Sequence, residues 1–219
     1  QDGKITITER DITTNLPYVP GVHIAFDHHA SETVRNQSGL KNHVIDATAP
    51  SAARVVFDYY GGAAAFPNIT VDMMDAVDKA DSAQYVREEI MHPEGWVLLN
   101  YLMDARTGLG RFREFRISNY ALMMDLIQYC RNHGIEDILS LPDVKERIDI
   151  YQEHADKARA QIERCATVHG NLVVLDLRNE DTIWATNRFM VYALFPQCNI
   201  SIHVMWGVQK QNTVLATGK

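Results

Sequence analysis

Short apolar runs alternate with polar segments along the first half of the chain. Ile5–Thr8 alternates apolar and polar residues and Gly21–Phe26 is mostly apolar, so both stretches are predicted to be strands. Helices are predicted over 52–60, 68–83, 96–103 and 120–130. The polar stretch 36–46 is predicted to be a loop. Strands that alternate with helices are typical of an α/β fold.

The second half is organised around one long helix. Pro142 opens a polar helix predicted over 143–168, and Gly170 ends it. Strands are predicted over 172–177, 200–206 and 212–216, with a helix over 184–194 between the first two. We therefore predict a parallel-sheet domain over 1–140, a linker helix over 141–168, and a smaller α/β domain over 169–219.

Composition and charge narrow the class of protein. Of the 219 residues, 46% are apolar and 22% are charged, as in an ordinary soluble globular protein. No apolar run approaches the roughly eighteen residues of a membrane span. The formal net charge of −7 argues against binding of duplex nucleic acid, although it allows a local basic pocket. Cys130, Cys165 and Cys198 form no Cys-x-x-Cys pair, which is typical of reduced thiols in the cytoplasm.

The most informative motif is the triplet Asp27-His28-His29, which closes the apolar run 21–26. Open α/β sheets bind their ligands at the carboxyl ends of strands, where this triplet is predicted to lie. Imidazole and carboxylate together suit Mn²⁺, Zn²⁺ or Mg²⁺. The triplet alone is a weak signal, because histidine pairs are common. An α/β scaffold with an incidental histidine pair is therefore an alternative.

Acidic residues lie before and after the triplet. Asp11 ends the segment that follows the first predicted strand, and Asp78 and Asp81 lie three apart on the helix predicted over 68–83. Taken alone, these two residues favour a solvated acidic face. The order of acid, Asp-His-His and acid resembles the DHH superfamily of phosphoesterases. The stretch 81–85 resembles the exopolyphosphatase-related branch, near the oligoribonucleases, and the resemblance extends from Asp11 to Lys219.

The resemblance implies a role for each residue. Asp11 would bridge two metal ions, and His28 would ligate one of them. Asp81 would ligate the same ion, with Asp78 as the alternative. Asp27 would orient a ligating imidazole, and His29 would face the substrate phosphate, so these two are the expected catalytic residues. The expected cofactors are two Mn²⁺ or Mg²⁺ ions, because two ions can hold both the attacking water and the phosphate oxygens.

Two elements of this family are not found in the chain. They are a first strand that ends in a metal-binding motif and a glycine-rich loop in the second domain. The chain also begins with Gln1. We therefore expect both domains to be incomplete, with the region 1–140 as a DHH domain and 169–219 as the start of a DHH-associated substrate domain. Such a portion, holding about half of a two-metal site, is expected to be inactive alone.

Basic residues in the second half are candidates for substrate binding. The resemblance places a phosphate-contacting basic residue after the last strand, which implies Lys219, and Arg188 is a second candidate. A different candidate is the loop 106–116, which holds four arginines and two phenylalanines. An ordinary charged loop is the alternative for that segment.

We interpret the chain as a metal-dependent phosphohydrolase that cleaves a phosphoester or phosphoanhydride. Its expected partner is a small phosphorylated substrate, such as polyphosphate, a short oligoribonucleotide or a nucleotide. It is expected to bind no membrane and no duplex nucleic acid, and the interpretation leaves room for a homodimer. The alternative is a non-catalytic nucleotide-binding or regulatory module on the same fold, because a fold alone does not imply chemistry.

Overall fold

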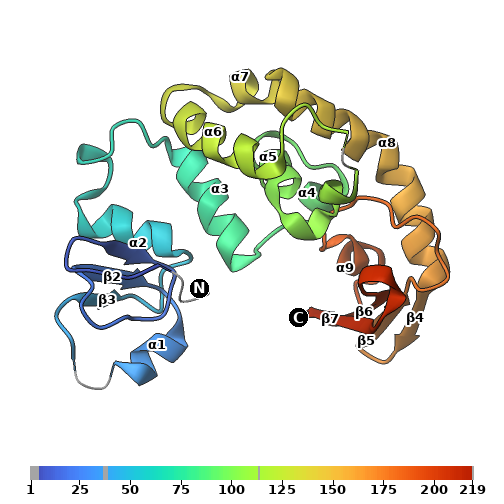
Figure 1. The fold of residues 1–219 in the computed structure, drawn as a ribbon, viewed down its shortest axis with the longest axis horizontal. Coiled ribbons are helices and arrows are strands. Elements are labelled where there is room, and N and C mark those ends of the chain that lie inside the picture. Colours follow the sequence, from blue (N-terminus) through green and yellow to red (C-terminus); the bar gives the residue numbers. More distant parts are fainter. Residues whose placement is uncertain (1–4, 37–38, 113, 219) are drawn as a thin grey trace. The chain divides into compact units, whose positions relative to one another are not determined.

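The computed structural model describes residues 5–36, 39–112 and 114–218. The chain packs as two compact units that divide between Tyr85 and Val86, and each unit has its own sheet (Figure 1). This division by packing differs from the boundaries at 140 and 168. Those boundaries were drawn for functional domains and stay a prediction. Both units combine strands with helices, so the α/β class is confirmed.

The first unit is built on a parallel sheet. Its strands are β1 (Ile12–Thr14), β2 (Ile24–Asp27) and β3 (His43–Ile45), with β2 in the centre. The strand predicted at 5–8 is wrong, because the backbone there makes no ladder and pairing begins at Ile12. The loop predicted over 36–46 is also wrong in part, because β3 lies within it. β3 pairs with β2 although its own sequence is too short to show a period.

Three helices complete the first unit, together with the short turn η1 (Gly62–Ala64). They are α1 (Ala30–Arg35), α2 (Ala52–Tyr59) and α3 (Val71–Ser82). Ser51 caps the start of α2, since its hydroxyl accepts a hydrogen bond of 3.0 Å from the Arg54 N–H. α2 buries Val55 against Ile24 and Phe26 of the central strand. This small core holds the carboxyl end of β2 in place.

The second unit begins with helices around one apolar core. They are α4 (Arg87–Met91), α5 (Gly95–Met103), α6 (Asn119–Asn132), α7 (Ile135–Leu139) and α8 (Pro142–Cys165). Two short turns, η2 (Ala105–Thr107) and η3 (Leu109–Arg111), follow α5. The long helix is confirmed, but it ends at Cys165 because the next residue begins a strand. Within the described residues, no helix is both long and apolar enough to cross a bilayer.

A mixed sheet follows α8. Its strands are β4 (Ala166–His169), β5 (Leu172–Asp176), β6 (Ile200–Trp206) and β7 (Thr213–Gly218), and only β5 and β6 run parallel. The turn η4 (Val208–Lys210) joins the last two strands. The helix predicted over 184–194 is wrong in its first half, because only α9 (Met190–Leu194) is helical. Residues 182–187 are irregular and are held by side chains of α8.

One arginine fastens the start of α8 to the helical core. The side chain of Arg147 is fully buried and donates to the backbone carbonyls of Ile117 and Asp143, at 2.7 and 2.6 Å. It also donates to Asn119 and Glu146, and its guanidinium lies 4.1 Å from the centre of the Phe115 ring. A buried charge is tolerated here because its donors are satisfied.

We therefore expect Arg147→Ala to lower the free energy of unfolding by about 3–5 kcal/mol, because the buried acceptors lose their donor. Denaturation in urea, followed by circular dichroism, measures the loss. Arg116→Ala is the control, because that exposed side chain pairs only loosely with Asp143, at 3.7 Å, and should change stability by less than about 0.5 kcal/mol. Equal losses for the two variants would contradict the anchoring role.

Candidate functional site

The carboxylate of Asp27 closes the end of the central strand β2. Asp27 is 1% exposed, and its Oδ1 accepts hydrogen bonds from the N–H groups of His28 and His29, at 2.7 and 2.8 Å. Burial opposes the charge of this carboxyl group, but the hydrogen bonds from His29 and His28 outweigh burial and lower its pKa. The chain therefore passes from β2 into α1 through a turn that is held by the hydrogen bonds of this carboxylate.

The imidazole of His29 is oriented by the same carboxylate. Its Nδ1 lies 2.7 Å from Asp27 Oδ1, so Nδ1 carries the hydrogen that is donated. In the neutral ring the other nitrogen, Nε2, is then an acceptor. The side chain is 54% exposed, so the ring of His29 is open to solvent at the carboxyl edge of the sheet.

His28 faces a carboxylate from α3. Its Nδ1 lies 3.2 Å from the carbonyl oxygen of Ala49, which can only accept, so Nδ1 is the donor. Its Nε2 lies 3.1 Å from Asp81 Oδ2. That distance is within ion-pair range, but Nε2 has no hydrogen-bond partner among the described residues. Asp81 Oδ2 therefore lies beside Nε2 without a hydrogen bond between them.

This arrangement fits a divalent cation. Two ligand atoms about 2.1 Å from one ion lie about 3.0–3.4 Å apart at octahedral or tetrahedral angles, which matches the pair of His28 and Asp81. Imidazole and carboxylate suit Mn²⁺, and Mg²⁺ often takes few protein ligands and keeps several waters. Among the described residues no group of three or more His, Cys, Asp or Glu side chains can hold a metal ion. The pair is therefore a partial site.

Asp78 is engaged elsewhere. Its carboxylate accepts from the Ser51 hydroxyl at 2.6 Å and from Arg54 Nε and Nη2, at 2.8 and 2.5 Å. These bonds tie α3 to the start of α2. The hydrogen bond to Asp78 also raises the pKa of Arg54. Of the two aspartates named from the sequence, Asp81 is therefore the one that lies against His28.

The expected placement of Asp11 is wrong. Asp11 directly precedes β1, and its carbonyl accepts from the His23 N–H at 3.0 Å, which puts it level with the start of β2. Because the strands are parallel, it lies at the opposite edge of the sheet from Asp27. Its carboxylate accepts from the Thr8 N–H and hydroxyl, which lower its pKa. The misplaced strand at 5–8 caused the error, since the acids precede the true strand instead of following it.

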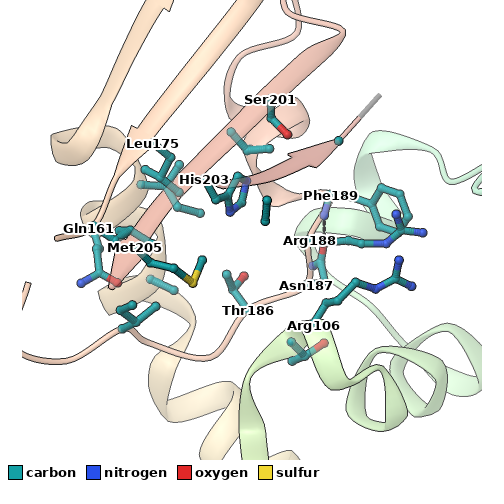
Figure 2. Close-up of a pocket in the computed structure, with 18 of the residues that line it drawn as sticks. Arg106, Gln161, Leu175, Thr186, Asn187, Arg188, Phe189, Ser201, His203 and Met205 are labelled. Carbon is teal, nitrogen blue, oxygen red and sulfur yellow. Dashed lines mark hydrogen bonds between the residues drawn. The ribbon is translucent and has the colours of Figure 1, made fainter. Parts of the chain in front are cut away.

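The second unit contains a pocket of about 320 Å³. It lies between the irregular segment 182–189, α8 and the face of the mixed sheet, and Figure 2 shows His203 and Met205 of β6 pointing into it. Arg106, Arg111 and Arg188 line it, and no Asp or Glu does so among the described residues. The volume and the largely apolar wall are typical of a small-molecule site.

Side chains of α8 hold one wall of this pocket. Gln161 donates to the Thr182 carbonyl at 2.7 Å and accepts from the Trp184 N–H at 3.1 Å. His154 accepts from the Ala185 N–H at 3.3 Å. Asn187 donates to the Ile90 carbonyl and the Tyr151 hydroxyl, both at 2.9 Å. The polar groups of these side chains are thus used inside the protein, and the segment is fixed in shape.

Two substrate-binding residues were predicted for this unit. Arg188 lines the pocket, and its Nε lies 3.7 Å from Asp104 Oδ2. Lys219 and Arg113 lie outside the described residues. Sequence reasoning missed His203, which burial keeps at a lowered pKa and therefore neutral near pH 7. The only sequence feature that could have indicated His203 was its position in the strand predicted over 200–206.

Comparisons with known proteins place the chain near one enzyme. No model of a protein family matches it, and no curated protein does. Among solved structures it is similar to a pGpG-specific phosphodiesterase, PggH, from Vibrio cholerae. The two are 59% identical with a TM-score of 0.85, and the match covers 100% of this chain and 70% of that chain.

The two aspartates of α3 should differ in what their removal does. Asp78→Ala should lower the free energy of unfolding by about 1–3 kcal/mol, because it leaves Arg54 and Ser51 without their acceptor. Asp81→Ala should change stability by less than about 0.5 kcal/mol in EDTA, because it removes an electron pair that opposes another. Urea denaturation of both variants measures this difference. A larger loss for Asp81→Ala would show that the pair with His28 is structural.

Proposed function

The chain belongs to the family of the pGpG-specific phosphodiesterase PggH, and from that premise we propose that it hydrolyses a phosphodiester bond in a small phosphorylated dinucleotide. The single observation that carries the chemistry is the opposed pair of His28 Nε2 and Asp81 Oδ2, 3.1 Å apart beside the buried Asp27 turn. Of the substrates considered from the sequence, the relative's name favours a linear dinucleotide over polyphosphate.

The proposal includes the DHH class and dependence on Mn²⁺. The triplet Asp27-His28-His29 at the carboxyl end of β2 supports the class, and the acid on α3 supports the metal. His28 and Asp81 would hold the cation, and further ligands would come from water and substrate oxygens. When bound, such a cation supplies an activated water and neutralises phosphate charge.

The chain's own residues would then position and protonate the substrate. Asp27 holds the His29 ring so that Nε2 faces outward, where it can accept a proton from the attacking water and then return that proton to the leaving 3′ oxygen. Water adds to phosphorus, the P–O3′ bond breaks, and pGpG yields two molecules of GMP. Asp27 is buried and hydrogen-bonded to this ring, so it orients His29 without contacting substrate.

The rival proposal is a binding module without chemistry. One observation favours it, because the described residues bring together two metal-binding side chains and no third. The two proposals differ in turnover, and both allow binding of a dinucleotide. A cytoplasmic location and a homodimer stay predictions.

Hydrolysis provides the test. The full-length protein should release GMP from pGpG in the presence of Mn²⁺, and EDTA should stop the release. His28→Ala should lower kcat by at least about 100-fold, because it removes half of the cation pair. Chromatography of the nucleotides measures both effects. His133→Ala is the matched control, since that exposed imidazole contacts only its own helix.

Each outcome separates the alternatives. Binding of pGpG without any release of GMP would favour the module over the enzyme. Normal turnover by His28→Ala would contradict the proposed role of His28 in holding a catalytic cation. Faster release of phosphate from polyphosphate than of GMP from pGpG would favour polyphosphate as the substrate, as in the exopolyphosphatase-related branch.

A further inference from the structure

Arg54 of α2 contacts α3 at one defined place. Its Nε and Nη2 both donate to Asp78 Oδ2, at 2.8 and 2.5 Å, and Nη2 lies 3.5 Å from Asp75 Oδ1. The guanidinium also lies 5.7 Å from the centre of the Phe57 ring, and the side chain is 26% exposed. Asp78 is buried, so this pair is better shielded from water than an ion pair at the surface. The arginine is therefore held in one orientation between its own helix and α3.

α3 carries aspartates at a spacing of three residues. Asp75, Asp78 and Asp81 follow one another along it, and each step is about 4.5 Å along the helix axis and about 60° around it. Arg54 contacts the first two, and His28 Nε2 lies 3.1 Å from Oδ2 of the third. A shift of α3 by one step would bring a different aspartate to His28. The bond between Arg54 and Asp78 therefore sets which aspartate lies there.

Asp81 depends on such an anchor because it lies in the last turn of α3. The helix ends at Ser82, and the next residue, Ala83, has a φ of +58°. The last turn of a helix lacks some of the backbone hydrogen bonds that hold its middle. Here the Ser82 hydroxyl donates to the Asp78 carbonyl at 2.7 Å. The turn that carries Asp81 is thus joined to Asp78, and Asp78 is joined to Arg54.

The imidazole of the cation pair is held by the same segment of chain. His28 Nδ1 lies 3.2 Å from the carbonyl oxygen of Ala49. Two residues later, the Ser51 hydroxyl donates to Asp78 Oδ1 at 2.6 Å and accepts from the Arg54 N–H at 3.0 Å. The residues that lead into α2 therefore hold both His28 and α3, and they set the distance across the pair.

We propose that Arg54 is a positioning residue for the proposed cation site, because its bond to Asp78 holds Asp81 opposite His28. The inference rests on the proposed function and deepens it by naming a residue that would contact neither cation nor substrate. Removal of a residue that orients metal ligands typically weakens metal binding by about 10- to 100-fold. Lysine carries one donor nitrogen where arginine has a rigid pair, so it cannot fully reproduce this orientation.

Binding of Mn²⁺ without substrate tests the inference. It is measured on the full-length protein by the loss of the electron paramagnetic resonance signal of the free ion. Arg54→Ala should raise the Kd for Mn²⁺ by about 10-fold or more, and Arg54→Lys should recover only part of that loss. Arg54→Ala combined with Asp78→Ala should bind no more weakly than the weaker single variant, because the two residues act as one unit.

Turnover provides a second readout. At low Mn²⁺, Arg54→Ala should hydrolyse pGpG slowly, and saturating Mn²⁺ should return its rate to near that of the unmodified protein. A positioning residue has this effect because its loss removes no group that reacts or binds substrate. A low rate that persists at saturating Mn²⁺ would overturn the inference.

Two control variants separate positioning from a general loosening of the first unit. Val55→Ala removes buried packing between α2 and the central strand, so it should lower thermal stability without changing the Kd for Mn²⁺. Arg35→Ala removes an arginine that pairs with Glu32 of its own helix, so it should leave the Kd unchanged. Circular dichroism establishes that each variant is folded at the temperature of the measurement, and Arg54→Lys carries the comparison if Arg54→Ala does not fold.

The outcomes distinguish this inference from the proposed function. An unchanged Kd in folded Arg54→Ala or Arg54→Lys, or an equal rise in Val55→Ala, would overturn the inference. If the inference alone fails, His28→Ala still binds Mn²⁺ weakly while Arg54→Ala binds it normally. If His28→Ala binds Mn²⁺ as tightly as the unmodified protein, the proposed cation site is wrong and the inference falls with it.

Discussion

The carboxylate of Asp27 is the interaction on which the candidate site depends. It lies buried at the end of the central strand, where burial raises its pKa, and three hydrogen bonds from the next two residues outweigh burial and lower it. Those bonds turn the chain out of the sheet and fix the ring of His29. The same turn directs His28 between Ala49 and Asp81. A rigid turn of this kind lowers the cost of organising a site when ligand arrives.

Two aspartates of helix α3, Asp78 and Asp81, have different partners and therefore different roles. Residues three apart on a helix are separated by about 60° around its axis. They therefore lie on the same face of the helix but can contact different neighbours. Asp78 is turned toward Arg54 and Ser51, where it joins two helices. Asp81 is turned toward His28, where the electron pairs are left unsatisfied. An aspartate that is paired with an arginine, as Asp78 is, stabilises the fold. An aspartate that lies beside an imidazole nitrogen, as Asp81 does, is available to bind a cation.

The pocket of the second unit shows why net charge is a poor guide to ligands. The chain carries a formal charge of −7, yet three arginines line this pocket and, among the described residues, no Asp or Glu does so. Attraction between charges weakens steeply with distance and salt, so the few groups that line a pocket outweigh a distant surplus. The acidic balance argues against broad binding of duplex nucleic acid, which stays a prediction, and it does not exclude a local basic pocket.

The sequence by itself determined the central strand ending in Asp27, the long helix α8 and the α/β class, because each depends on local pattern. It did not determine where the first strand begins, so Asp11 was expected at the wrong edge of the sheet. It also left open the choice between Asp78 and Asp81, which depends on how α3 rotates against α2. Tertiary structure decided these points, and it assembled Arg111, Arg188 and His203 from distant segments, because register, rotation and pocket walls arise from contacts between elements.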